Sequence, residues 1–158
     1  AKDYTIESAL ASTETLKIAV PNDVTNEGRA LKLLESAGFF TINADAGASP
    51  EISDITDYAV PVEFVEVDAN LVYSVIQDVD LAVINGNYAM EAGFSVGKDA
   101  LATEDASSEA AQTYANVLVV KEGRENDPAI QALYAALTSD KVKDYINSTY
   151  DGAVVPIF

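Results

Sequence analysis

The chain has 158 residues, 49% of them hydrophobic, with 26 acidic against 9 basic side chains and a net charge of −17. This size allows one domain or two small lobes, and the acidic field would repel a phosphate backbone, which argues against nucleic acid as a partner. The absence of cysteine and histidine excludes disulfides, thiolate metal sites and the commonest general base.

The first part of the chain predicts strands and one long helix. Residues 16–20 form a short apolar run typical of a strand, and residues 25–37 have the periodicity of an amphipathic helix. The predicted buried stripe of this helix is Ala30, Leu33, Leu34 and Ala37. Residues 39–42 predict another short strand. Residues 43–61 are rich in Gly, Ser, Pro and Asp, which indicates a loop with one helical turn near residues 52–58.

The middle of the chain continues the alternation of strands and helices. Residues 62–67 predict a strand and residues 69–77 a helix. The continuous apolar run at residues 81–84 is typical of a strand covered on both faces. A short helix at residues 88–92 and a strand at residues 114–120 are expected to follow.

The last part of the chain is predicted to be helical. Asp127-Pro128 is a typical helix start, with proline at the first helical position. Ser139 can cap a final helix, and Gly152 is expected to end it. The alternation along the whole chain predicts an α/β fold with at least a partly parallel sheet.

A candidate polar site lies at the start of the predicted helix 25–37. At about 100° per residue, Asn26 falls within the apolar stripe and Arg29 falls at its edge. The first-turn N–H groups of a helix favour an anion, and Arg29 could bind a carboxylate through two hydrogen bonds. The alternative is that Asn26 caps the helix and Arg29 pairs with a surface acid.

Three asparagines follow or interrupt apolar strands. Asn85 and Asn87 flank Gly86 where the strand 81–84 ends, and ligands of open α/β sheets bind beyond the carboxyl ends of strands. The alternative is a simple turn, because Asn-Gly is a favoured turn pair. Asn116 interrupts a further apolar run, where its amide would bond either a ligand or the backbone.

The sequence offers little support for catalysis. Residues 93–97 read Gly-Phe-Ser-Val-Gly, which matches the elbow that presents a nucleophilic serine in hydrolases. That mechanism needs a histidine to accept the serine proton, and the chain has none. Asp78 and Asp80 lie in a predicted turn, where aspartate is favoured for its backbone hydrogen bonds. We therefore expect no enzyme, no catalytic residue, no metal and no cofactor.

Four segments, taken together, resemble one known family. Residues 18–31 read IAVPNDVTNEGRAL, residues 78–89 read DVDLAVINGNYA, residues 114–120 read YANVLVV, and residues 152–156 read GAVVP. In this order they are similar to the NlpA family, the lipoproteins that deliver methionine to an ABC importer. The likeness extends over almost the whole chain.

The resemblance implies a type II periplasmic-binding fold, in which two α/β lobes hold an amino acid between them. Carried over by position, Arg29 would bind the ligand carboxylate with Asn26 beside it. Asn85 and Asn116 would contact the head group. Weaker candidates are Asn87 and Tyr88. The ligand would be L-methionine or a related amino acid.

The resemblance also implies that the first lobe of the family is missing. Residues 1–15 would then be a hinge-proximal segment, residues 16–113 the second α/β lobe with a mixed sheet flanked by helices, and residues 114–158 a return strand with C-terminal helices. In the full-length protein the expected partner is an ABC permease, and a lipid anchor would hold the protein at the extracellular face of the membrane. A domain-swapped homodimer of this portion is conceivable, because its tail has apolar faces to cover. The alternative function is a ligand-sensing effector domain that regulates a partner protein.

Overall fold

The computed structural model describes residues 4–105, 107, 109–150 and 152–158. The chain forms two compact units, Ala1–Glu104 and Asp105–Phe158, called here the first and the second unit. The α-helices of the first unit are α1 (Ile6–Leu10), α2 (Val24–Ser36), α3 (Gly86–Glu91) and α4 (Val96–Asp99). Its strands are β1 (Leu16–Pro21), β2 (Phe40–Ile42), β3 (Ile55–Tyr58), β4 (Val62–Val67) and β5 (Leu81–Ala82). Its single 3₁₀ turns are η1 (Ala44–Ala46), η2 (Ile52–Asp54) and η3 (Val72–Val75).

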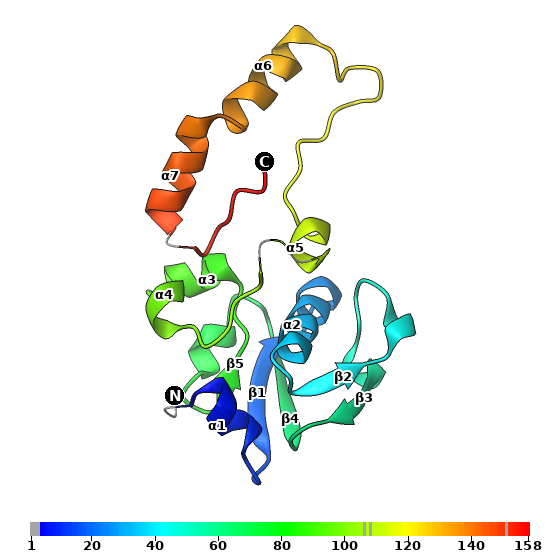
Figure 1. Ribbon diagram of the computed structural model, residues 1–158, viewed down its shortest axis with the longest axis vertical. Coiled ribbons are helices and arrows are strands. Elements are labelled where there is room, and N and C mark those ends of the chain that lie inside the picture. Colours follow the sequence, from blue (N-terminus) through cyan, green and yellow to red (C-terminus); the bar gives the residue numbers. More distant parts are fainter. Residues whose placement is uncertain (1–3, 106, 108, 151) are drawn as a thin grey trace. The chain divides into compact units, whose positions relative to one another are not determined.

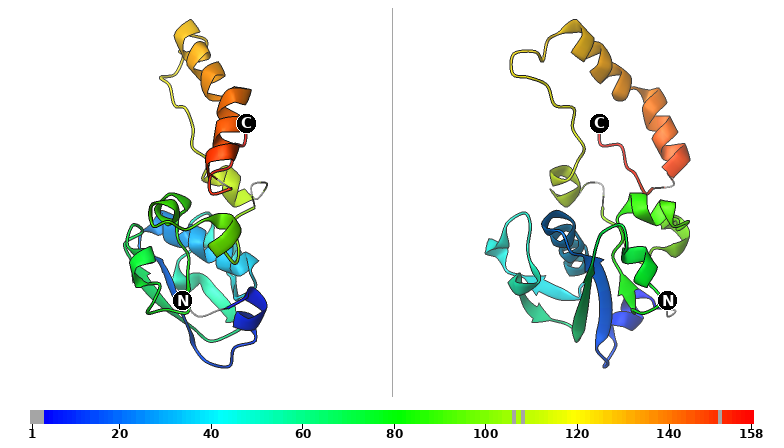
Figure 2. Two further views of the ribbon diagram at one scale, coloured as in Figure 1. Left: turned by 90° about the vertical axis from the view of Figure 1, so that its left-hand side faces the viewer. Right: turned by 180° about the vertical axis from the view of Figure 1, so that it is seen from behind.

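A parallel three-stranded sheet with the order β4-β1-β5 forms the centre of the first unit (Figure 1; seen from behind in Figure 2, right). Strand β1 pairs with β4 from Leu16↔Val62 onward and with β5 at Ile18↔Leu81. Every residue of β1 except Lys17 is buried, as expected of a strand with neighbours on both sides and cover on both faces. The predicted strands at residues 16–20 and 62–67 are confirmed.

Two layers of side chains cover the sheet, because successive residues of a strand point to opposite faces. Ile18 and Val20 lie in the larger apolar cluster, together with Leu31 and Leu34 of α2. Ala19 belongs to a smaller cluster with Val72. The predicted helix at residues 25–37 is confirmed, but its buried stripe differs, because Leu31 rather than Leu33 is fully buried.

Strands β2 and β3 form a separate antiparallel pair. The expectation of a loop with a helical turn over residues 52–58 is therefore wrong beyond Asp54. The Phe40 ring packs edge-on against Tyr58 of the partner strand and against Phe64 of β4, with centroid separations of 5.8 and 5.9 Å. Cross-strand aromatic contacts of this kind stabilise a strand pair, and they are made by residues far apart in sequence.

The predicted helix at residues 69–77 is wrong. Only η3 forms there, with Val72 fully buried and Leu71 45% exposed. The Ser74 hydroxyl donates to the Leu71 carbonyl, and the Ser74 N–H donates to the same oxygen at 2.9 Å. Local bonds of this type compete with a continuous α-helix, so the segment stays a single 3₁₀ turn.

The second unit contains α5 (Glu109–Thr113), α6 (Pro128–Leu137) and α7 (Asp140–Tyr150). As predicted, Asp127 caps α6, accepting from the Ala129 N–H at 3.0 Å. The expected strand at residues 114–120, including the return strand of the domain assignment, is wrong. No strand occurs among the described residues of this unit, so the apolar run has no neighbour to pair with, and Val117 and Val119 are 75% and 80% exposed.

Across the described residues of both units, no helix is long and apolar enough to cross a membrane.

Candidate functional site

The loop from β1 into α2 positions the first polar side chain of the site. Asp23 caps α2, because its carboxylate accepts from the Asn26 N–H at 3.1 Å. The alternative that Asn26 itself caps the helix is therefore wrong. Asp23 also accepts from the Asn26 amide nitrogen, at 3.1 and 2.9 Å through its two oxygens. These bonds fix the Asn26 side chain, so that its Oδ1 atom is presented as an acceptor.

The side chain of Asn85 contacts that of Asn26 within the first unit. Strand β5 ends at Ala82, and Asn85 occupies the residue before α3 without using its side chain as a cap. The pair Asn85-Gly86 therefore starts a helix and is not the simple turn of the alternative interpretation. The Asn85 Nδ2 atom donates to Asn26 Oδ1 at 2.7 Å. The structure thus brings together two of the predicted asparagines, which are 59 residues apart.

The other side-chain atom of Asn85 is left unsatisfied. Asn85 Oδ1 is buried and has no hydrogen-bond partner among the described residues. A buried acceptor without a donor costs roughly 1–3 kcal/mol, so such atoms are rare and call for an explanation. One explanation is a bound molecule that donates to this oxygen.

Arg29 lies one turn after Asn26 and pairs with an acid that the sequence did not single out. Its Nε atom donates to Glu104 Oε1 at 2.9 Å, and its Nη2 atom donates to Glu104 Oε2. The side chains are 40% and 21% exposed, respectively. The alternative of a surface ion pair is thus confirmed only in part: Arg29 does pair with an acid, but the pair is partly buried and spans 75 residues.

The remaining predicted residues lie elsewhere. Asn87 is exposed and Tyr88 half-buried, both on α3. Asn116 is exposed and belongs to the second unit, so the expectation of a buried amide in a strand is wrong. A ligand-binding role for these three residues stays a prediction.

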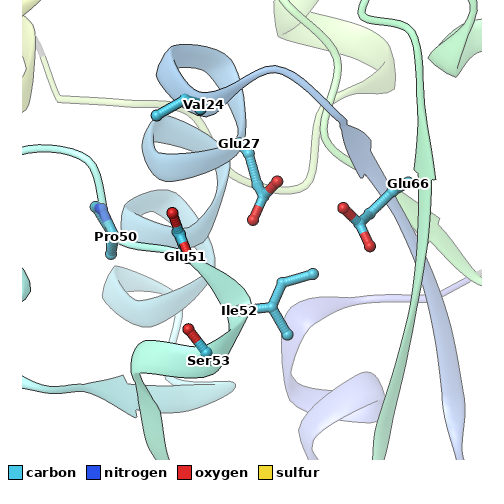
Figure 3. Close-up of a pocket in the computed structure, with 7 residues that line it drawn as sticks. All are labelled: Val24, Glu27, Pro50, Glu51, Ile52, Ser53 and Glu66. Atoms are coloured by element: carbon cyan, nitrogen blue, oxygen red, sulfur yellow. The ribbon is translucent and has the colours of Figure 1, made fainter.

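An acidic pocket of about 310 Å³ lies on the first unit beside α2 (Figure 3). Its lining is Val24, Glu27, Pro50, Glu51, Ile52, Ser53 and Glu66. The carboxyl groups of Glu27 and Glu66 point toward each other in Figure 3. Burial raises the pKa of Glu27 above its ordinary value of 4.5, the nearby Glu66 adds to the rise, and a backbone hydrogen bond from Ile52 opposes it. Among the described residues, no group of three or more acidic side chains is arranged to hold a metal ion.

The raised pKa of Glu27 predicts that the substitution Glu27→Gln increases the stability of the folded protein in a pH-dependent way. A carboxyl whose pKa is higher in the folded state is penalised when charged, so its contribution to stability falls as pH rises above 4.5. At pH 7 we expect the variant to unfold with a slightly larger free energy; the gain is small because the side chain is only partly buried. This gain in stability should disappear as the pH is lowered from above the pKa of Glu27 in the folded protein to its ordinary value of 4.5. Urea unfolding at several pH values measures it.

Glu14→Gln is the matched control, because Glu14 is exposed and the substitution removes the same charge. A control variant that gains as much stability at pH 7 would attribute the effect to the net charge of −17 rather than to the pocket.

The sequence model of the NlpA lipoprotein family matches residues 5–158. The chain belongs to the NlpA lipoprotein family. The predicted resemblance is confirmed, and so is the α/β fold with a parallel sheet flanked by helices.

Individual NlpA relatives agree with this assignment. Membrane lipoprotein TpN32 of Treponema pallidum is 46% identical over 139 residues, which cover 87% of this chain and 50% of that protein. Methionine-binding lipoprotein MetQ of Bacillus subtilis is 34% identical over 143 residues, covering 89% of this chain and 51% of that protein. The structure of a nutrient binding protein from Burkholderia cenocepacia bound to methionine superposes with a TM-score of 0.75 at 30% identity, covering all of this chain and 64% of that one. The chain thus spans about half the length of the curated relatives it matches.

Proposed function

We propose that this NlpA-family chain is part of the solute-binding component of an ABC amino-acid importer, with methionine as the ligand. In this proposal Arg29 binds the ligand carboxylate with Asn26 beside it, and Asn85 and Asn116 contact the amino-acid head group. Asn87 and Tyr88 are secondary candidates. The support is the family match, together with relatives whose names describe methionine binding.

The single observation that carries the proposal is the unsatisfied Asn85 Oδ1 atom. Its neighbour Nδ2 is held by Asn26, so the amide cannot turn over without losing that bond. The Asn85 oxygen can therefore accept a hydrogen bond from a ligand. The ammonium group of an amino acid carries three N–H donors. A charged donor makes a stronger hydrogen bond than a neutral one.

Arg29 supports the same assignment, because it can bind the carboxylate of the amino-acid head group. A guanidinium binds carboxylates through two parallel hydrogen bonds, and Arg29 already holds a carboxylate in this way. In a chain with a net charge of −17, a ligand carboxylate needs such a cation to approach, because the surrounding field repels it.

Titration of the ¹⁵N-labelled chain with L-methionine tests the proposal. We expect saturable shift changes centred on Asn26, Arg29, Asn85 and Asn116, which such spectra detect even for weak binding. Shifts that scatter over the surface, or none up to tens of millimolar, would contradict the proposal.

Asn85→Ala is expected to weaken methionine binding about tenfold, which corresponds to one lost hydrogen bond of roughly 1.4 kcal/mol. The dissociation constant from the same titration measures the effect. Asn147→Ala is the control, because Asn147 is exposed on α7 and its loss should leave the constant unchanged. Equal constants for Asn85→Ala and the unmodified chain would remove Asn85 from the site.

The transport context is part of the same proposal. We place the protein at the extracellular face of the membrane through a lipid anchor, with an ABC permease as its partner. The support is that relatives are named as lipoproteins, including a membrane lipoprotein. The non-enzymatic role agrees with the relatives' names, which describe binding proteins and lipoproteins.

A further inference from the structure

The Arg29–Glu104 ion pair raises a question for the proposed function. Glu104 takes the Nε and Nη2 donors of the guanidinium, which form one of the edges that a ligand carboxylate would use for two parallel bonds. Both side chains are partly shielded from water. A ligand carboxylate that binds this edge must therefore displace the Glu104 carboxylate.

We propose that Glu104 is a specificity-determining residue that exchanges partners, leaving Arg29 when a ligand carboxylate arrives and pairing with the ligand ammonium group. This inference rests on the proposed function, because it assumes an amino-acid ligand at Arg29. Such an exchange of partners would select zwitterionic α-amino acids over simple carboxylic acids.

The charges around α2 support the exchange. Arg29 follows Asn26 by three positions, so the two lie on nearly the same side of the helix. Asn26 holds Asn85, whose Oδ1 atom still needs a donor. A guanidinium with its paired carboxylate and an unsatisfied amide oxygen are thus both held by side chains of the first turns of α2. An α-amino acid places a carboxylate and an ammonium group on one carbon, which is the charge pattern that complements these groups.

A simple carboxylic acid complements these groups less well. It would break the Arg29–Glu104 pair and form one equivalent pair, which leaves a partly buried Glu104 carboxylate without a cation. An unpaired and desolvated charge is costly. An amino acid breaks the same pair and supplies both new partners. Discrimination therefore arises from a penalty on the wrong ligand as much as from attraction to the right one.

Glu104 is better suited to this exchange than Asp23, the acid that caps α2. Both oxygens of Asp23 already accept from the Asn26 side chain, and one also caps the helix. Glu104 lies on irregular backbone after α4, so its side chain is not fixed by a helix or strand. Its carboxylate is held by Arg29.

The test compares two ligands on three proteins. L-methionine and its deaminated analogue 4-(methylthio)butanoate are titrated into the unmodified chain, Glu104→Gln and the charge-matched control Glu14→Gln, with ¹⁵N shifts as the readout. We expect the unmodified chain and the control to prefer methionine by the same factor. In Glu104→Gln that preference should fall about tenfold or more, because the analogue no longer competes with a carboxylate and methionine loses its ammonium partner.

Three results would decide against the exchange. An unchanged preference in Glu104→Gln overturns it and leaves the proposed function standing. Equal tightening of both ligands shows that Glu104 only blocks Arg29, which overturns the ammonium contact. Failure of methionine to bind the unmodified chain overturns the proposed function as well. If Glu104→Gln does not fold, Glu104→Asp replaces it; a preference lower than in Glu14→Gln supports the exchange and an equal preference contradicts it.

Discussion

Leu31→Ala is expected to destabilise the first unit by about 3 kcal/mol, within the roughly 2–5 kcal/mol found for such truncations in packed cores. The Leu31 side chain is fully buried and belongs to the cluster that joins α2 to β1. Alanine would leave a cavity there, because the surrounding side chains are held by the sheet and relax only in part. Urea unfolding followed by circular dichroism should show a midpoint lowered by about 1 M or more.

Leu33→Ala on the same helix is the matched control for Leu31→Ala. The substitution and the helix propensities are identical, but Leu33 is only half-buried, so we expect a clearly smaller loss. Equal losses for the two variants would show that helix α2 is not packed on the sheet through Leu31. A change in the dependence of stability on urea concentration would indicate an altered denatured state instead.

Elements with strong local signals were predictable from the sequence. Strand β1 is a run of buried residues closed by a turn, and α6 begins at Asp127-Pro128, where both residues favour a helix start. In each case the interactions that fix the element lie within a few residues. The sequence pattern and the final structure therefore depend on the same contacts.

Elements that depend on distant partners were not predictable in the same way. Strand β3 forms because β2 and the Phe40 ring lie beside it. The apolar residues 114–120 show the converse, because no strand pairs with them in the described part of the second unit. The spacing of apolar residues shows which side of a segment can be buried, whereas strand formation also requires a neighbouring strand.

The candidate site shows the same division. A helical wheel placed Asn26 within the apolar stripe, and Asn85 followed the end of a predicted strand; the structure joins these two side chains by a hydrogen bond. Glu104 could not be found, since nothing in a single sequence links it to an arginine 75 residues earlier. The pocket at Glu27 was not predictable either, because it is formed only when β4 brings Glu66 beside this residue.

The shift of the buried stripe from Leu33 to Leu31 has a signal in the sequence that periodicity does not use. Gly28 lies on α2 where the helix approaches residues 49–50, and a Cβ atom there would lie 2.9 Å from the Ser49 Cα and 3.1 Å from the Pro50 Cδ. A glycine inside a helix costs about 1 kcal/mol relative to alanine. Its presence here is explained by this close approach, which sets the rotation of α2 against the rest of the unit.

Gly28→Val is therefore expected to destabilise the first unit by about 3 kcal/mol, the upper end of the cost typical of overpacking. The atoms that a new side chain would meet belong to backbone and to a proline ring, which cannot rotate away. Because α2 must then shift, we also expect weaker coupling between Asn26 and Asn85, seen as changed side-chain amide shifts of both residues. Urea unfolding and ¹⁵N spectra measure the two effects on one sample.

Ser36→Val on the same helix separates crowding from the poor helix propensity of valine. Ser36 is exposed at the end of α2, so this variant adds a β-branched residue without a close neighbour, and its cost should stay below about 1 kcal/mol. Gly28→Ala adds a second comparison, because alanine improves helix propensity while introducing the same Cβ clash. A net loss of stability in Gly28→Ala means that crowding outweighs propensity at this position. A net gain of stability would show that residues 49–50 move aside. The turn of α2 that carries Asn26 and Arg29 would then be less constrained than the contact distances imply.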